Sequence, residues 1–444
     1  MAITAEDPGL LRVVDAVLVP GYRGTQVPDW LADAIRGGLA GVCWFAQNLD
    51  GVEPADAAAQ LKDYRGDLLV LSDEEGGAVS RIEPGGSSWP GNAALGRIDD
   101  LGLTERVAAA MAAGVRAAGI DVMLAPVVDV NSDPANPVIG IRSFGATAGL
   151  VSRQGAAFVR GVQSQGIAAC AKHFPGHGAT RTDSHVALAR VDDALDVLRE
   201  RDLAPFAAAI HAGVRTVMTA HILFPQVDAQ PATMSAVWMS LLRAELGFEG
   251  VVISDALDMK AISAGVGRGP GAVRALAAGV DLLCVGNPEF PETYDAREVW
   301  HGVRHAIAAA VADGALARAR LESAATRVAE LAAWRSSTTA APVHAADLAE
   351  QVAWRCMQME GDPRVGARVV VVVEAAVSVA AGDDAATRLA AGLSGALVAA
   401  RLTPRNAAAI SGPFGRTRAT RSFRPIPAAR KASTTSVRWS QSRP

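Results

Sequence analysis

Short runs of apolar residues recur along the first two thirds of the chain, with amphipathic segments between them. Eight of these runs predict strands: Val14–Val19, Gly41–Phe45, Asp67–Leu71, Asp121–Ala125, Ile167–Ala171, Val214–Thr219, Gly250–Ser254 and Val280–Val285. Most of them lack polar alternation, as expected for parallel strands that are covered on both faces.

The segments between these runs predict helices, for example over Thr104–Ala118, Leu150–Gln165, Ala194–Ala212 and Ala236–Leu246. A glycine commonly ends the helix just before the next strand, which suits a helix C-terminal turn. Strands that alternate with helices in this way predict a mixed α/β fold, a (β/α)8 TIM-type barrel. An open doubly wound sheet is the alternative, but its dinucleotide-binding fingerprint is missing.

Beyond the barrel, the pattern predicts a helix from Gly314 to Trp334, a linker to Pro342, and a second helix over Ala345–Met359. Five consecutive valines then predict a strand of another α/β unit. We therefore expect a catalytic domain over residues 1–340 and a linker helix with a partial second domain over 341–410.

The last segment, residues 411–444, has eight basic residues, no acidic residue and no apolar period. Such a segment cannot bury enough apolar surface to order itself, so we expect a disordered tail. A nucleic-acid-binding tail is one interpretation, and a truncated or out-of-frame end of the second domain is the other.

Composition excludes several classes of protein. The net charge of −4 argues against nucleic acid as the main partner. The four cysteines lie far apart and form no CxxC pair, which predicts reduced thiols and no zinc site. The N-terminus lacks the pattern of a signal peptide, and no apolar run is long enough to span a bilayer. We expect a cytoplasmic protein with no membrane partner.

Ionisable and coordinating residues gather just after the predicted strands. They are Asp73, Glu74, Glu75, Asp129, Asn131, Lys172, His173, His221, Asp255, Asp258 and Asn287. In a barrel, side chains at the carboxyl ends of the strands converge on one mouth, so these residues predict an active site.

The segment from His173 to His185, HFPGHGATRTDSH, holds three of the eight histidines of the chain. Its end, Asp183-Ser-His185, places a carboxylate where it could fix the tautomer of an imidazole. That pair would act as a general acid and base near neutral pH. A simple Asx-turn is the alternative. Lys172 precedes the segment and is one of only four lysines beside 38 arginines, which favours a need for an ammonium group there.

Asp255 ends a buried run, so it is a candidate nucleophile or electrostatic stabiliser, with a helix N-cap as the alternative. In the string from Asp73 to Arg81, paired glycines let the backbone bend closely round a ligand. Asp73 could accept two sugar hydroxyls, while Arg81 could donate a fork of hydrogen bonds. Arg142 is a further donor on a loop after a strand.

Together these strings resemble the bacterial β-N-acetylglucosaminidases of glycoside hydrolase family 3 (the NagZ group). The resemblance covers roughly residues 10–335 and rests on KHFPGHG with DSH, the Asp73–Arg81 string, Arg142 and SDALDM around Asp255. The histidine-rich loop is the most specific of these motifs. Two positions depart from the family pattern: Ala78 stands where arginine is usual and Glu74 where glutamine is common.

The resemblance implies roles residue by residue. Asp255 would be the nucleophile, His185 the acid and base, and Asp183 the residue that orients His185. The sugar would be bound by Asp73, Arg81, Arg142, Lys172 and His173. The implied enzyme is a retaining β-N-acetylhexosaminidase that acts by double displacement on β-glycosides such as muropeptide fragments from cell-wall peptidoglycan, with no cofactor or metal.

A histidine donor is uncharged once it has given up its proton, so phosphate could approach the glycosyl-enzyme as readily as water. Phosphorolysis is therefore the second interpretation, with phosphate as a partner beside the carbohydrate. Two further classes stay open: a metal-dependent barrel hydrolase that uses His173, His177 and His221, and an inactive sugar-binding protein. Pro175 and Gly176 argue against a metal-binding helix, and the presence of the full catalytic set argues against inactivity.

Overall fold

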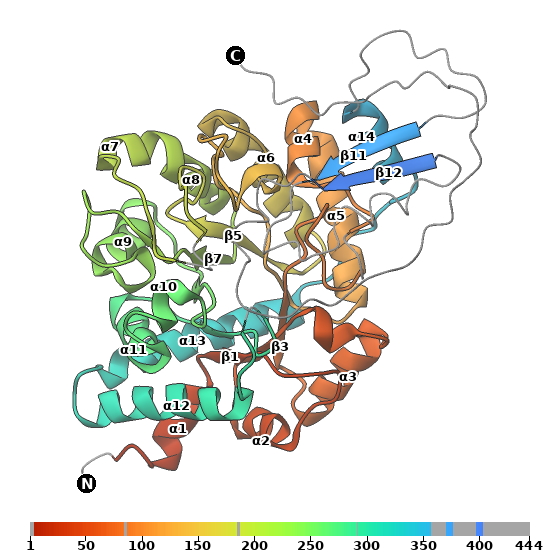
Figure 1. Cartoon of the computed structure of the whole chain (residues 1–444). Coiled ribbons are helices and arrows are strands. Elements are labelled where there is room, and N and C mark those ends of the chain that lie inside the picture. Colours follow the sequence, from red (N-terminus) through yellow and green to blue (C-terminus); the bar gives the residue numbers. More distant parts are fainter. Residues whose placement is uncertain are drawn as a thin grey trace, which may run out of the picture. The chain divides into compact units, whose positions relative to one another are not determined.

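The computed structural model describes residues 4–83, 87–183, 187–290, 292–356, 370–375 and 397–402 (Figure 1). The chain forms two compact units, Met1–Cys356 and Met357–Pro444. In the second unit, β11 (Val370–Ala375) and β12 (Leu397–Leu402) pair in parallel, which confirms the strand predicted after Arg368. The predicted tail, 411–444, lies outside the described residues.

A parallel sheet forms the centre of the first unit. Its six strands run in the order β2 (Gly41–Trp44), β3 (Leu69–Ser72), β4 (Val122–Met123), β5 (Ala168–Phe174), β7 (Thr216–Thr219) and β9 (Val251–Ser254). β1 (Leu18–Pro20) pairs in parallel with β10 (Leu283–Gly286), and a bridge joins Ile253 to Leu282 beside β10. The fold is a mixed α/β structure with a curled parallel sheet, and a strand occurs in each of the eight predicted runs.

The first predicted strand is wrong in its N-terminal half. Residues up to Asp15 belong to helix α1 (Pro8–Asp15), whose start is fixed by Asp7, the acceptor of a hydrogen bond from Leu10 N at 2.8 Å. The apolar residues Leu10 and Val14 are four apart and lie on the buried face of this helix. The single apolar run Val14–Val19 therefore contributes to two elements, the end of α1 and the start of β1.

Helices surround the sheet (Figure 1). The predicted helices are confirmed as α5 (Leu101–Ala117) and α6 (Ala148–Gln163). The other elements are α2 (Asp29–Gly37), α3 (Pro54–Tyr64), α4 (Asn92–Ile98), α10 (Lys260–Ser263), α11 (Arg268–Ala278), α12 (Ala296–Ala312), α13 (Arg318–Ser337), α14 (Leu348–Cys356) and the short pair β6 (Ala189–Arg190) and β8 (Ile222–Leu223).

Two predicted helices contain a widened turn. The first consists of α7 (Leu195–Leu198), a π-helical turn over Arg199–Leu203 and α8 (Ala204–His211). Pro205 follows the π turn and has no N–H to donate to the previous turn, which accounts for the widening there. The second consists of α9 (Ala236–Ser240) and a π turn over Leu241–Glu245.

The amino ends of the strands are closed by structural contacts. Val328 and Leu331 of α13 pack against the apolar residues inside the curl of the sheet. Beside them, the buried Asp281 pairs with Arg243 and Arg320. The four cysteines are all buried, as their apolar sequence surroundings predict. The opposite, carboxyl ends of the strands carry the polar residues that are described below.

Among the described residues, no helix combines the length and the apolar character that crossing a membrane requires.

Candidate active site

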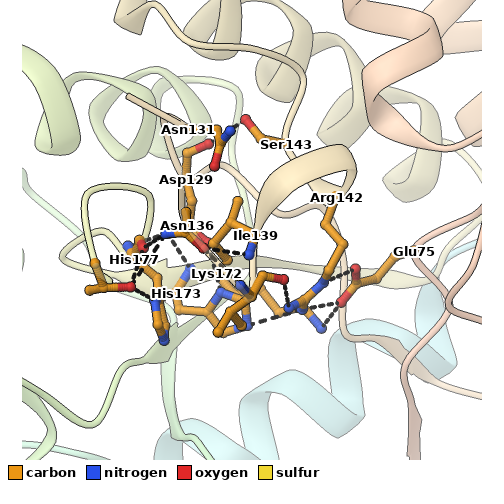
Figure 2. A network of polar contacts seen from close by, with 12 residues as sticks. Glu75, Asp129, Asn131, Asn136, Ile139, Arg142, Ser143, Lys172, His173 and His177 are labelled. Atoms are coloured by element: carbon orange, nitrogen blue, oxygen red, sulfur yellow. Dashed lines mark hydrogen bonds and ion pairs between the residues drawn. The ribbon is translucent and has the colours of Figure 1, made fainter. Parts of the chain in front are cut away.

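Acidic and basic side chains from the loops after β3 and β4 and from β5 meet at the carboxyl end of the sheet (Figure 2). Lys172 Nζ of β5 lies 2.7 Å from Asp73 Oδ1 and 2.7 Å from Glu75 Oε1, both on the loop after β3. Arg142, on the loop after β4, holds Glu75 through two hydrogen bonds of 2.8 Å. Arg81 Nη2 approaches Asp73 Oδ2 at 3.3 Å. These five residues form one network of alternating charge.

The side chains of this network differ in how far they are exposed to solvent. The side chains of Glu75 and Lys172 are each 2% exposed, whereas those of Asp73 and Arg81 are 21% and 17% exposed. Arg142 lies between these limits at 8%. Asp73 and Arg81 are therefore the members most accessible to a ligand, while Glu75 and Lys172 are the most buried.

The charges in the network stabilise one another. Burial alone would raise the pKa of Asp73, but Lys172 and Arg81 hold that pKa well below its usual value. Burial also opposes the charge on Glu75, yet Arg142 and Lys172 lower its pKa to about 2. Burial would lower the pKa of Lys172, but Asp73 and Glu75 raise it above its ordinary value. All these groups are therefore charged at neutral pH.

Lys172 and His173 are consecutive residues of one strand, and both face this site. The register between β5 and β7 shifts between Ala171 and Phe174. Such an irregularity re-aims side chains that would otherwise alternate between the two faces of a sheet. It explains how Lys172 reaches Glu75 while His173 lies 3.4 Å from Arg142.

The hydrogen bonds of His173 assign its tautomer. Nε2 faces Arg142 Nη2, and a guanidinium has no acceptor, so Nε2 must accept. Nδ1 then carries the proton and donates to Asp129 Oδ2 at 2.8 Å. The ring is thus held between a cation and a carboxylate, with its orientation fixed by both.

Asp129 anchors the turn that starts the histidine-rich segment. Besides the His173 ring, its Oδ1 accepts from the backbone N–H groups of His173 at 3.3 Å and His177 at 2.6 Å. Burial would raise the pKa of Asp129, but His173 and these donors lower it. Burial lowers the pKa of His177 to about 4. His177 is therefore uncharged at neutral pH, and its Nδ1 lies 2.7 Å from Thr180 Oγ1.

Two glycines of the HFPGHG string are required by close packing. Gly176 has φ of +137°, and a methyl group there would meet the side chain of Asp202 at 2.7 Å. A methyl group on Gly178 would lie 1.8 Å from the Val130 carbonyl oxygen. Residues larger than glycine would push the segment away from the sheet.

Asp255 follows β9, which is separated from β5 by β7 alone in the strand order. It is half-buried, and its Oδ1 accepts from Ala256 N at 2.8 Å. The next helix, α10, has Met259 at its N-cap, so Asp255 does not cap it. The neighbouring Asp258 accepts from Asn287 N at 2.7 Å and the Tyr294 hydroxyl at 3.1 Å, contacts that tie its turn to the loop after β10.

Of the predicted sugar-binding residues, Asp73, Arg81, Arg142 and Lys172 belong to this network, in which Glu75 links Arg142 to Lys172, and His173 lies beside Arg142. Asp183 is half-buried, and its carbonyl accepts from Ala187 N at 3.1 Å. His185 lies outside the described residues, so its pairing with Asp183 stays a prediction.

The histidines proposed for a metal site have other contacts. His221 Nδ1 lies 2.8 Å from Thr233 Oγ1 and its Nε2 lies 3.0 Å from the Ala256 carbonyl oxygen. Within the described ranges, no group of three or more histidine, cysteine, aspartate or glutamate side chains could hold a metal ion. His173 and His177 serve the Asp129 turn instead.

Glu75 and Asp129 each follow a predicted strand, but nothing in the sequence indicates a specific role for either residue. Glu75 contacts Arg142, which is 67 residues away in the sequence, and Asp129 contacts His173, which is 44 residues away. A buried acid directly after a predicted strand was the available signal, but it did not say which cation the acid would meet.

We predict that Asp129→Asn lowers the free energy of unfolding by about 2 kcal/mol at pH 7, because the amide loses acceptors for buried N–H groups. The folded pKa of Asp129 is depressed, so its contribution exists above the unfolded pKa and is lost as pH falls through the folded value. Urea unfolding should therefore show the wild-type advantage at pH 7 and a smaller one below about pH 4.

Asp133→Asn is the matched control, because Asp133 lies on the same loop and pairs with the exposed Arg181. We expect it to change stability by less than about 0.5 kcal/mol. A deficit of Asp129→Asn that is equal at pH 3 and pH 7 would contradict the electrostatic role of Asp129.

Several known proteins are similar to this chain. Residues 25–331 match the family model of the glycosyl hydrolase family 3 N-terminal domain. A β-hexosaminidase of Stenotrophomonas maltophilia is 41% identical over 290 residues, which cover 62% of this chain and 84% of that protein.

Solved structures show the same likeness. A glycoside hydrolase family 3 β-N-acetylglucosaminidase from Paenibacillus has a TM-score of 0.77 at 34% identity, over 88% of this chain and 79% of that one. NagZ from Neisseria gonorrhoeae, solved with N-trifluoroacetyl-D-glucosamine, has a TM-score of 0.57 at 29% identity, over 71% of this chain and 97% of that one.

Proposed function

Because the chain belongs to glycoside hydrolase family 3 and is a β-N-acetylhexosaminidase, we propose that it cleaves its substrate with retention of configuration. Asp255 is the proposed nucleophile, His185 the acid and base, and Asp183 the residue that orients His185. The proposed framework is the (β/α)8 barrel within residues 1–340, followed by the partial second domain over 341–410 and the tail over 411–444.

In the first step, an Asp255 oxygen attacks the anomeric carbon while His185 protonates the departing glycosidic oxygen. The bond to the aglycone breaks, and a glycosyl-enzyme ester forms with inverted configuration. In the second step His185, now uncharged, takes a proton from water, whose oxygen displaces Asp255. Two inversions give net retention.

The charged network is the proposed binding site for the transferred sugar. Asp73 and Arg81 are its most exposed members and suit the outer hydroxyls, because a carboxylate accepts and a guanidinium donates. Arg142, Lys172 and His173 lie deeper and offer fixed polar groups to the rest of the ring. Such fixed groups cost little reorganisation when the sugar binds.

The observation that carries the proposal is the convergence of these five residues, from three separate loops and strands, into one network. NagZ of N. gonorrhoeae is a structural relative solved with an N-acylglucosamine, which supports an N-acetylated sugar as the ligand. We propose muropeptide fragments as the natural substrate and water as the acceptor. The cytoplasmic location stays a prediction.

Product analysis on a disaccharide of N-acetylglucosamine β-linked to N-acetylmuramic acid tests this function. Incubation in phosphate-free buffer is expected to release free N-acetylglucosamine, first as the β-anomer in the proton NMR spectrum. Adding phosphate should leave the rate and the product unchanged. If sugar 1-phosphate is the main product, the enzyme is a phosphorylase and the proposed hydrolysis is wrong. If the α-anomer forms first, the proposed retention of configuration is wrong.

A further inference from the structure

Glu75 occupies the centre of the charged network, and neither family likeness nor sequence motif gives it a role. Its Oε1 accepts from Arg142 Nη2 at 2.8 Å and Lys172 Nζ at 2.7 Å, while its Oε2 accepts from Arg142 Nε at 2.8 Å. Figure 2 shows Arg142 between Glu75 and His173. Both carboxylate oxygens are thus occupied by buried cations.

This arrangement places two positive charges against one carboxylate oxygen. Arg142 and Lys172 repel each other, and both are buried where water screens charge weakly. Asp73 contacts Lys172 through its Oδ1 and acts on Arg142 only through a longer-range charge interaction. Glu75 is the carboxylate that contacts both cations, so their separation depends on it.

We propose that Glu75 is a positioning residue: it holds the charged ends of Arg142 and Lys172 at the spacing that the sugar requires and thereby sets substrate affinity. The proposal rests on the sugar-binding roles given to those two cations above. Both carboxylate oxygens of Glu75 already accept hydrogen bonds from Arg142 or Lys172, so its proposed part is to hold these cations. Its loss should therefore act on binding more than on the chemical steps.

The adjacent Glu74 offers a matched control. It is also buried, but its oxygens accept from Ser72 Oγ at 2.9 Å, Ser80 Oγ at 2.6 Å and Arg81 N at 2.9 Å. These partners are uncharged, and glutamine can keep most of these contacts. Glu74→Gln thus makes the same chemical change one residue away without touching the two cations.

The test compares Glu75→Gln, Glu74→Gln and wild type by kcat and KM on an aryl N-acetyl-β-glucosaminide and by the Ki of N-acetylglucosamine. For Glu75→Gln we expect KM and Ki to rise by roughly 10- to 100-fold, the usual effect of losing hydrogen bonds to a charged group, with a smaller change in kcat. For Glu74→Gln we expect changes below about 3-fold.

The pH profile separates positioning from a general structural role. The charged groups that act on Lys172 are Asp73, Glu75 and Arg142. Without Glu75, Asp73 still favours the ammonium, but burial and Arg142 both oppose it, so the pKa of Lys172 falls from its wild-type value. The ratio of variant to wild-type Ki should therefore rise at alkaline pH, because Lys172 loses its charge at a lower pH in the variant than in wild type. For Glu74→Gln this ratio should stay flat.

An unchanged Ki and a flat ratio in folded Glu75→Gln would overturn the proposal. Should that variant fail to fold, Glu75→Asp decides: it keeps the charge but withdraws it by one methylene, so Ki should rise without the alkaline dependence. An unchanged Ki for Glu75→Asp overturns the proposal. Failure of wild type to release N-acetylglucosamine would instead remove the function on which the proposal rests.

Discussion

Asp255→Ala is expected to lower kcat by roughly 10⁴- to 10⁶-fold on all N-acetyl-β-glucosaminides, because no glycosyl-enzyme can form. Added azide should partly restore turnover of substrates with activated leaving groups, since it fits the space of the lost carboxylate and attacks from the same face. The product should be the α-glycosyl azide, identified by NMR.

Asp258→Asn is the matched control for this prediction. Asp258 lies three residues further on and accepts hydrogen bonds from Asn287 N and Tyr294, which asparagine can also accept. We expect its kcat to stay within about 10-fold of wild type. Equal losses in both variants would show that the turn after β9 matters for structure and that Asp255 has no special chemical role.

His185→Ala is expected to discriminate between leaving groups. For a disaccharide, whose departing oxygen must be protonated, kcat/KM should fall by roughly 10²- to 10⁴-fold. For a dinitrophenyl glycoside, which departs without a proton, the loss should be below about 10-fold. Azide should now intercept the glycosyl-enzyme from the opposite face and give the β-glycosyl azide.

The surface residue His305, which faces Glu6 at 3.8 Å, provides a control. His305→Ala should behave as wild type on both substrates. Equal losses of His185→Ala on the disaccharide and the dinitrophenyl glycoside would argue against proton donation by His185.

The strands were predictable because their two faces are both covered, so apolar runs mark them directly. Val251–Ser254 lies inside its predicted run. Helix ends and interruptions were less predictable. The start of α1 depended on the cap by Asp7, and the π turn before Pro205 breaks a continuous amphipathic pattern. Local backbone and side-chain hydrogen bonds determine where these helices start and widen, and the spacing of apolar residues does not predict such hydrogen bonds.

The sequence identified most members of the charged network but not the contacts between them. Strand ends and motifs identified the sugar-binding candidates, and the structure brings five of them together. The central place of Glu75 between Arg142 and Lys172 arises from three segments that meet only in the fold. The tautomer of His173 likewise depends on Arg142 and Asp129, which are distant in sequence.

The central claim is that an aspartate at the end of β9 attacks a sugar held by the network at the ends of β3, β4 and β5. Trapping with a fluorinated N-acetylglucosaminide that carries an activated leaving group tests it most directly, followed by mass spectrometry of the digested protein. We expect a single covalent sugar on the peptide that contains Asp255. Excess N-acetylglucosamine should slow this labelling, because it competes for the same site. A label on any other carboxylate would contradict the account.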